Sequence, residues 1–125
     1  MSGHRALVLL VDDEPRILSA LKRSLRREGY EIVSAESSTD ALSILDERPV
    51  DLIVSDQKMP GTSGLELLAE VARRHPSVPR VLLTGWPEEV PPKRLEALGV
   101  GALLPKPWDD AELKAVVRAQ LQSRP

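Results

Sequence analysis

The chain contains no cysteine and no phenylalanine among its 125 residues, and its few aromatic side chains are Tyr30, Trp86 and Trp108. Without cysteine there can be no disulfide, no thiolate metal ligand and no cysteine nucleophile. The hydrophobic content of 42% is nevertheless enough for the core of one compact domain. That core must therefore be built almost wholly from aliphatic side chains.

A surplus of charge of one sign is also missing. The 17 basic and 19 acidic side chains leave a formal net charge of −2, which is no electrostatic footprint for nucleic acid. The longest apolar run, Ala6–Val11, is too short to cross a bilayer and ends in two aspartates rather than a cleavage site. We therefore expect no direct nucleic acid binding, no membrane association and a cytoplasmic location.

Apolar runs of strand length alternate five times with segments of helical period. This alternation is typical of βαβ units around a parallel sheet, so we expect a single doubly wound α/β domain of the (βα)5 type with a five-stranded parallel sheet. The expected strands are Ala6–Val11, Glu31–Ala35, Val50–Val54 (running into Ser55–Asp56), Arg80–Thr84 and Val100–Leu104.

The helices carry their own start and stop signals. Pro15 opens the first and Gly29 ends it, and Ser63 with Glu66 forms a capping box for the third. Prolines crowd the start of the fourth, so we expect a short helix over Pro92–Leu98, ended by Gly99. The second helix is expected around Ala41–Leu45, and Asp109 and Glu112 open the last. The domain spans residues 1–125, with a core of about 5–121 and a frayed end or linker start over Gln122–Pro125.

Chemically telling side chains fall at the carboxyl ends of these strands, where open α/β sheets bind their ligands. Each alone could be a helix cap, a turn residue or a solvated charge, but together they predict one small site. Clustered carboxylates need a cation to stay ionised, and oxygen ligands suit Mg²⁺. A lysine and a threonine hydroxyl suit a phosphoryl group, so the set favours phosphoryl transfer to a carboxylate. The residues are Asp12, Asp13, Asp56, Thr84 and Lys106.

The two histidines do not add to this set. His4 lies in the N-terminal arm and His75 lies beside Pro76, and we expect both to be solvated surface residues. No Ser–His–Asp arrangement competes with the predicted carboxylate site.

Four segments resemble the characteristic blocks of two-component response-regulator receiver domains, the CheY-like family. They are VLLVDDEP (Val8–Pro15), DQKMPGTSGLELL (Asp56–Leu68), LLTG (Leu82–Gly85) and KPW (Lys106–Trp108). The resemblance covers essentially the whole chain and implies the strand order 2-1-3-4-5. It also implies a switch that accepts a phosphoryl group, with no enzymatic activity beyond self-catalysed phosphorylation and dephosphorylation.

The resemblance assigns roles to individual residues. It implies that Asp56 is the phosphoacceptor and that Mg²⁺ is bound by Asp13, Asp56 and the backbone carbonyl of Lys58, and by Asp12 through water. Thr84, followed by Gly85, would be the switch hydroxyl. Lys106 would bind the phosphoryl group and precede a cis proline, Pro107.

The same resemblance implies the partners. A histidine kinase or phosphotransfer protein would supply the phosphoryl group, and an output protein or an output domain outside this chain would respond to it. A phosphorylation-dependent dimer is also compatible with the family. The wording SDQKMPG, LLTG and KPWDD is most similar to receivers of regulators that often carry phosphodiesterase-type or other enzymatic outputs.

Two positions depart from the family pattern. Leu103 stands where many receivers have a tyrosine or phenylalanine that reports phosphorylation, so coupling must run through Thr84 and the backbone. Trp86 is bulky, and with Lys58 it would flank the water that hydrolyses the phosphoryl group, which makes both residues candidates for tuning its lifetime. Alternatively, both point to solvent, or Trp86 belongs to a partner-binding surface.

Two other functions remain open at this point. A haloacid-dehalogenase-type enzyme also uses an aspartate nucleophile, but it needs an Asp-x-Asp spacing after the first strand, which is absent here. A pseudo-receiver would share the fold without being phosphorylated, although all five predicted site residues are retained.

Overall fold

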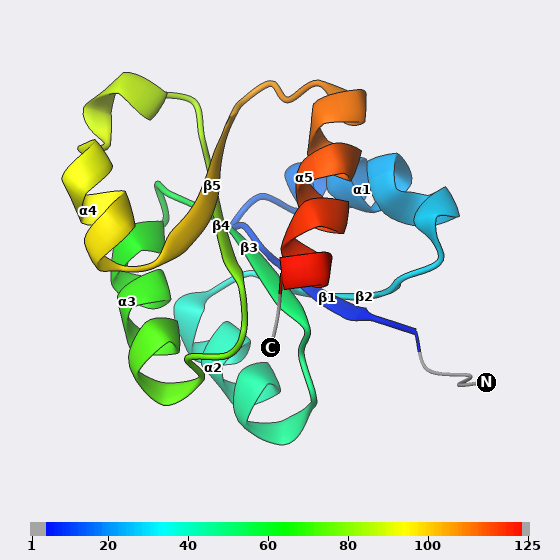
Figure 1. The fold of residues 1–125 in the computed structure, drawn as a ribbon, viewed down its shortest axis with the longest axis horizontal. Helices are drawn as coiled ribbons and strands as arrows, with labels where there is room; N and C mark the ends of the chain where they lie inside the picture. The colour runs from blue at the N-terminus through cyan, green and yellow to red at the C-terminus, as the bar shows by residue number, and fades with distance from the viewer. Residues whose placement is uncertain (1–4, 124–125) are drawn as a thin grey trace.

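The computed structural model describes residues 5–123 as a five-stranded parallel sheet with helices on both faces (Figure 1). The strand order is β2-β1-β3-β4-β5, as the family resemblance implies, and every neighbouring pair is parallel. The strands are β1 (Leu7–Val11), β2 (Glu31–Ala35), β3 (Leu52–Asp56), β4 (Arg80–Thr84) and β5 (Val100–Pro105).

The helices follow the strands in strict alternation. They are α1 (Pro15–Leu25), α2 (Ser38–Glu47), α3 (Gly64–Arg74), α4 (Pro92–Ala97) and α5 (Asp110–Ser123), with short 3-10 turns η1 (Arg26–Glu28) and η2 (Pro87–Glu89). The fold class predicted from the sequence is therefore confirmed. Helix α5 continues to Ser123, beyond the predicted core, and the remaining residues of the predicted tail, 124 and 125, lie outside the described residues, as does His4.

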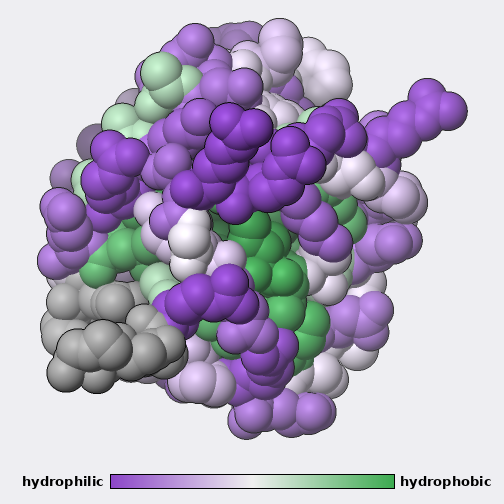
Figure 2. All heavy atoms as spheres, turned by 90° about the vertical axis from the view of Figure 1, so that its right-hand side faces the viewer, coloured by the Kyte–Doolittle hydropathy of each residue, from purple (hydrophilic) through white to green (hydrophobic). Residues whose placement is uncertain are grey.

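Alternating side chains of the central strands separate two aliphatic cores, because successive residues of a strand point to opposite faces. Leu9 of β1 packs with α2, α3 and α4 on one face, and Leu10 packs with α1 and α5 on the other. All five residues of β1 and of β3 are buried, as expected for strands covered on both sides. Hydrophilic side chains cover most of the outer face on the side of α1 and α5, and hydrophobic side chains show among them near its middle (Figure 2).

Several helices begin or end at the residues that the sequence signals indicate. Ser63 and Glu66 form the predicted capping box of α3. Gly29 and Gly99 adopt positive φ angles of 87° and 62°, which glycine tolerates and other residues rarely adopt. Pro105 lies in β5 at the sheet edge, where a missing backbone donor is tolerated.

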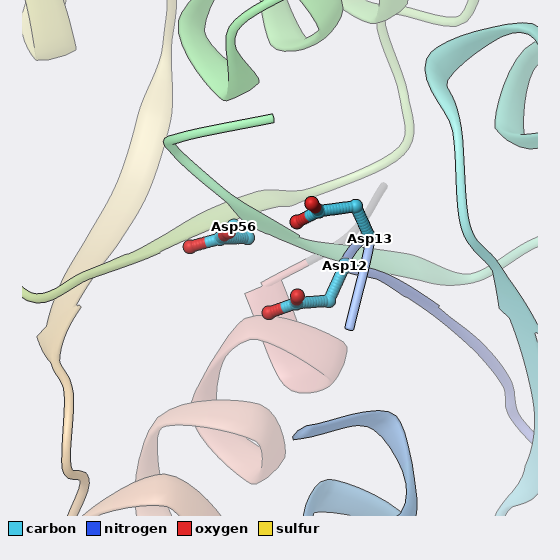
Figure 3. A group of neighbouring side chains, drawn as sticks. All are labelled: Asp12, Asp13 and Asp56. Carbon is cyan, nitrogen blue, oxygen red and sulfur yellow. The ribbon is translucent and has the colours of Figure 1, made fainter. Parts of the chain in front are cut away.

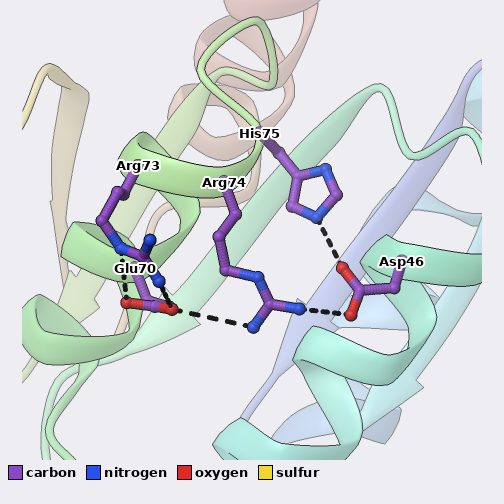
Figure 4. Close-up of polar contacts among 5 residues, drawn as sticks. All are labelled: Asp46, Glu70, Arg73, Arg74 and His75. Atoms are coloured by element: carbon purple, nitrogen blue, oxygen red, sulfur yellow. Dashed lines mark hydrogen bonds and ion pairs between the residues drawn. The ribbon is translucent and has the colours of Figure 1, made fainter.

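The prediction that His75 is a solvated surface residue was wrong. His75 is partly buried, and its Nε2 lies 2.9 Å from Oδ1 of Asp46 on α2. Arg74 pairs with the other oxygen of Asp46 and also contacts Glu70, which in turn pairs with Arg73 (Figure 4). This network joins the C-terminal ends of α2 and α3.

Candidate functional site

The strand register brings the five predicted site residues to one edge of the sheet. Asp12 and Asp13 directly follow β1, Asp56 ends β3 and Thr84 ends β4. Lys106 directly follows β5, and its backbone N–H donates to the Thr84 carbonyl at 2.8 Å. Because adjacent parallel strands end at the same level, residues up to 94 positions apart in the chain become neighbours.

Three carboxylates form the acidic centre of this edge. Asp12, Asp13 and Asp56 each offer an oxygen within 4.8 Å of the others, and the three carboxylates converge on one space from β1 and β3 (Figure 3). Asp12 is fully buried and Asp56 is 6% exposed. The oxygen-only donor set fits a hard cation such as Mg²⁺, which favours carboxylates, carbonyls and water.

A single ammonium group joins two of these carboxylates. Lys106 Nζ lies 2.9 Å from Oδ2 of Asp12 and 2.9 Å from Oδ1 of Asp56. Burial acts to lower the pKa of Lys106, but its hydrogen bonds to Asp12 and Asp56 outweigh that effect, so the pKa lies above its ordinary value. The lysine therefore stays charged and supplies a fixed cation at the acidic centre.

The environment of Asp56 differs from that of an exposed carboxylate. Burial raises the pKa of Asp56, repulsion from Asp12 adds to the rise, and the hydrogen bond from Lys106 opposes it. Removing the lysine would leave a buried, uncompensated pair of acids. The arrangement thus depends on a positive charge at this place.

Asp12 and Asp13 differ in how their oxygens are engaged. Both oxygens of Asp12 already accept hydrogen bonds, Oδ1 from the backbone N–H of Glu14 and Oδ2 from Lys106. Asp13 is only half-buried. The Asp13 side chain is thus more open to solvent than that of Asp12, whose two oxygens are already engaged.

Thr84 brings a hydroxyl to the same edge. It is 1% exposed, and its Oγ1 accepts the backbone N–H of Trp86 at 3.1 Å. Since the oxygen acts as acceptor in that bond, the hydroxyl hydrogen is free to be donated to a ligand. The Lys106–Pro107 peptide bond next to it is cis, the configuration that the family resemblance implies.

Lys58 and Trp86 lie together at the rim of the site. Lys58 Nζ lies 4.0 Å from the centroid of the Trp86 ring and 3.5 Å from Oε1 of Glu89. Trp86 is 48% exposed. The two side chains border an open pocket of about 520 Å³ that is also lined by Glu14, Ile17, Asp56, Thr84, Gly85 and Lys106.

Leu103, where the family resemblance leads us to expect an aromatic residue, is half-buried and packs against the core that contains α2, α3 and α4. Two further residues near the site were not found from the sequence. Glu89 pairs with Lys58, and Gln57 binds the start of α3 through its side chain. Neither has a local sequence signal, because each acts through a contact formed only in the folded chain.

Known proteins that are similar in sequence to this chain share one kind of domain. The family described as response regulator receiver domain matches residues 8–118. The chain is 38% identical over 126 residues to the transcriptional regulatory protein GlrR of Escherichia coli, covering 100% of this chain and 28% of that protein. The chain thus spans less than a third of the length of that relative.

Solved structures agree with the fold. The signal receiver domain of an HD domain-containing protein from Pseudomonas fluorescens is 35% identical with a TM-score of 0.86, covering 95% of this chain and 96% of that one. The response regulator protein TrrA from Thermotoga maritima, solved in complex with Mg²⁺ and BeF, is 34% identical with a TM-score of 0.83, covering 92% and 98%. No helix among residues 5–123 is long and apolar enough to cross a membrane.

Proposed function

This chain belongs to the family of response regulator receiver domains, and on that premise we propose that it is a Mg²⁺-dependent switch phosphorylated on Asp56. Receiver domains are signalling switches, and relatives of this chain such as GlrR are regulators. The observation that carries the assignment is the position of Lys106 Nζ, 2.9 Å from Asp56 and from Asp12 within the acidic centre. That lysine provides a positive charge beside the only carboxylate that ends a central strand of the sheet described here.

In the proposed reaction, an Asp56 carboxylate oxygen attacks the phosphorus of a phosphohistidine or a small acyl phosphate. A new oxygen–phosphorus bond forms, the bond to the leaving group breaks, and its electron pair stays with the donor's nitrogen or oxygen. Burial of Asp56 removes water from the nucleophile and strengthens its interaction with nearby charges. The product is an aspartyl phosphate.

Lys106 and Thr84 would stabilise the phosphoryl oxygens. The ammonium of Lys106 is held in place by Asp12, so it stays at the site when Asp56 is modified. Thr84 would donate its free hydroxyl hydrogen to a phosphoryl oxygen. Gly85 has no side chain to obstruct that approach, and a Cβ built on it would meet no atom within 4 Å.

The residues that would hold Mg²⁺ are Asp13, Asp56, the backbone carbonyl of Lys58 and, through water, Asp12. Bound there, the ion would offset negative charge on the carboxylates and on the phosphoryl oxygens. The engaged oxygens of Asp12 and the partial exposure of Asp13 support this division of roles.

The same contacts offer a route for the signal. Thr84 Oγ1 accepts the Trp86 backbone N–H, so a Thr84 that turns toward a phosphoryl group would release or redirect that N–H. The loop from Trp86 to Val90 includes η2 and leads directly into α4. We propose that this loop, rather than an aromatic side chain at position 103, carries the change to the surface.

The proposed partners follow from the same chemistry. A histidine kinase or phosphotransfer protein would supply the phosphoryl group, and an output protein or an output domain elsewhere would read the changed surface, with no direct contact to nucleic acid. Dimerisation of the phosphorylated form is compatible with this scheme, as is a cytoplasmic location.

The proposal predicts that Asp56→Asn abolishes Mg²⁺-dependent labelling by acetyl phosphate, because the amide is nearly isosteric but is a poor nucleophile. Intact and peptide mass spectrometry would check both the mass increase and its position. Asp40→Asn, an exposed carboxylate of α2, is the control and should be labelled like the wild type.

Two results would contradict the proposal. A phosphoryl group found at another residue of the wild type would overturn the assignment of Asp56. A wild type that neither binds Mg²⁺ nor accepts beryllofluoride in its presence would instead identify a pseudo-receiver. A haloacid-dehalogenase-type enzyme is disfavoured because the candidate nucleophile lies at the end of β3 and not after β1.

A further inference from the structure

We propose that Gln57 is a positioning residue whose side chain fixes the backbone of Lys58 beside the acidic centre and so sets the affinity of that centre for a divalent cation. The inference rests on the proposed function, in which the Lys58 carbonyl is one of the Mg²⁺ ligands. It adds a residue that touches neither metal nor phosphoryl group.

The first observation concerns the start of α3, where an isolated helix leaves its leading N–H groups without partners. Gln57 supplies two of the four acceptors needed here. Its backbone carbonyl accepts the N–H of Gly64 at 2.8 Å, and its side-chain Oε1 accepts the N–H of Leu65 at 2.9 Å. Ser63 Oγ accepts the N–H of Glu66, and Glu66 Oε1 accepts that of Ser63.

These bonds close residues 57–65 into a ring that contains Lys58. Gln57 is also tied to the sheet, because its backbone N–H donates to the Leu83 carbonyl of β4 at 3.0 Å. One residue thus joins β4, the loop after Asp56 and the first turn of α3. Lys58, the next residue along, lies within the ring and directly follows the residue that anchors it to the sheet.

The packing leaves the ring little freedom. A Cβ built on Gly64 would lie 2.1 Å from the Asp56 carbonyl oxygen and 2.9 Å from Gln57 Cα. Helix α3 therefore starts directly against the backbone of the phosphoacceptor strand. Gly64 and Leu65 are both buried and the Gln57–Leu65 hydrogen bond is partly buried, so loss of the Gln57 acceptor should be costly for the Leu65 N–H.

The two caps of α3 differ in what they hold. Ser63 caps the helix locally, within its own first turn. Gln57 reaches eight positions along the chain and fixes the intervening loop, including Lys58, as it does so. Loss of either cap should lower stability, but only loss of the Gln57 bond should free the Lys58 carbonyl to move.

The experiment compares Gln57→Met, which keeps the length but removes the acceptor, with Ser63→Ala as the matched cap control. Binding of Mn²⁺, with Mg²⁺ as competitor, is followed by electron paramagnetic resonance of the free aqua ion, and thermal stability is measured on the same samples. We expect Gln57→Met to weaken Mn²⁺ binding on the order of tenfold, as for loss of a group that orients a metal ligand. Ser63→Ala should melt earlier but bind Mn²⁺ like the wild type.

If Gln57→Met does not fold, Gln57→Asn serves instead: its side chain is one methylene shorter, so we expect it to fall short of the Leu65 N–H and to give the same loss. Wild-type Mn²⁺ affinity in the Gln57 variant, or an equal loss in Ser63→Ala, would overturn the inference. The variant Asp13→Asn distinguishes failure of the Gln57 inference from failure of the proposed metal site. If the wild type binds no Mn²⁺, or Asp13→Asn binds it unchanged, the metal site itself is misassigned.

Discussion

At the scale of single residues, Lys58 and Trp86 form the outer wall of the site. The Lys58 ammonium lies over the Trp86 ring and near Glu89, so the two long side chains cover one another at the mouth of the pocket that contains Asp56. Such cation–π contacts are worth about 0.5–1 kcal/mol at exposed sites. Because the contact is weak, we expect the two side chains to separate readily for a phosphodonor.

This geometry predicts a slow loss of the phosphoryl group from Asp56. Neither Lys58 nor Trp86 offers an acid or amide that would orient an attacking water, and both line the approach to it. We expect Lys58→Asn and Trp86→Ala each to speed hydrolysis several-fold, measured as decay of radiolabel after the donor is removed. Lys22→Asn, an exposed charge of α1 outside the pocket, is the control, and unchanged or slower decay in both site variants would contradict the shielding role.

The site residues were predictable from the sequence because each has a carboxylate, ammonium or hydroxyl group and lies at the end of an apolar strand. The hydrogen bonds that engage both oxygens of Asp12, by contrast, could be seen only in the folded structure. Gln57 and Glu89 were missed for the same reason, since their partners are set by how the loops close. His75 was misjudged because its partner, Asp46, lies on another helix.

At the scale of elements, α2 and α3 are joined at their C-terminal ends by the Asp46 network. The hydrogen bond with His75, followed by the charge and hydrogen bonds of Arg74, holds the pKa of Asp46 below its ordinary value of 3.8. A carboxyl whose pKa is lowered on folding stabilises the folded state above its unfolded pKa. That contribution is lost as the pH falls through the folded pKa.

We therefore expect Asp46→Asn to lower the free energy of unfolding modestly at neutral pH and to have a smaller effect well below pH 3.8. Urea denaturation at the two pH values would measure the difference. Glu47→Gln, an exposed carboxylate of the same helix, is the control. A deficit in Asp46→Asn that is as large in acid as at neutral pH would show that the charge of Asp46 is not the stabilising feature.

Element boundaries were predictable where a backbone preference defines them. Pro15 and Pro92 start α1 and α4, and the left-handed Gly99 follows α4 as expected, whereas the left-handed Gly29 follows the turn η1 and not α1 itself. The 3-10 turns η1 and η2 were not predicted, because a single tight turn leaves no periodic pattern. Helix α1 consequently ends at Leu25 and not directly at Gly29.

At the scale of the whole molecule, one sheet serves two cores. Leu9 and Leu10 are adjacent and fully buried, yet each belongs to a different core. Because β1 is an inner strand of the sheet, paired with β2 on one side and β3 on the other, loss of packing on either face disturbs the same strands. The two cores should not unfold independently.

Accordingly, Leu9→Ala and Leu10→Ala should each lower the free energy of unfolding by about 2–5 kcal/mol and keep a single cooperative transition. Leu9→Met and Leu10→Met, which conserve volume, should cost less than about 1.5 kcal/mol. Calorimetry and circular dichroism would measure the transitions. Two separate steps in either alanine variant would contradict a shared core.

The scarcity of aromatic residues has a consequence for spectroscopy. With no phenylalanine and one tyrosine, the near-ultraviolet absorption and the emission of this protein arise almost entirely from two indoles in unlike surroundings. Trp86 is half exposed beneath an ammonium group at the mouth of the pocket. The indole N–H of Trp108 is shared between Ser24 and Asp110, at 3.1 Å from each, where α1 meets the start of α5. The chain thus carries one native fluorophore at the rim of the candidate site and another where two helices meet, and the emission of both can be followed without an added label.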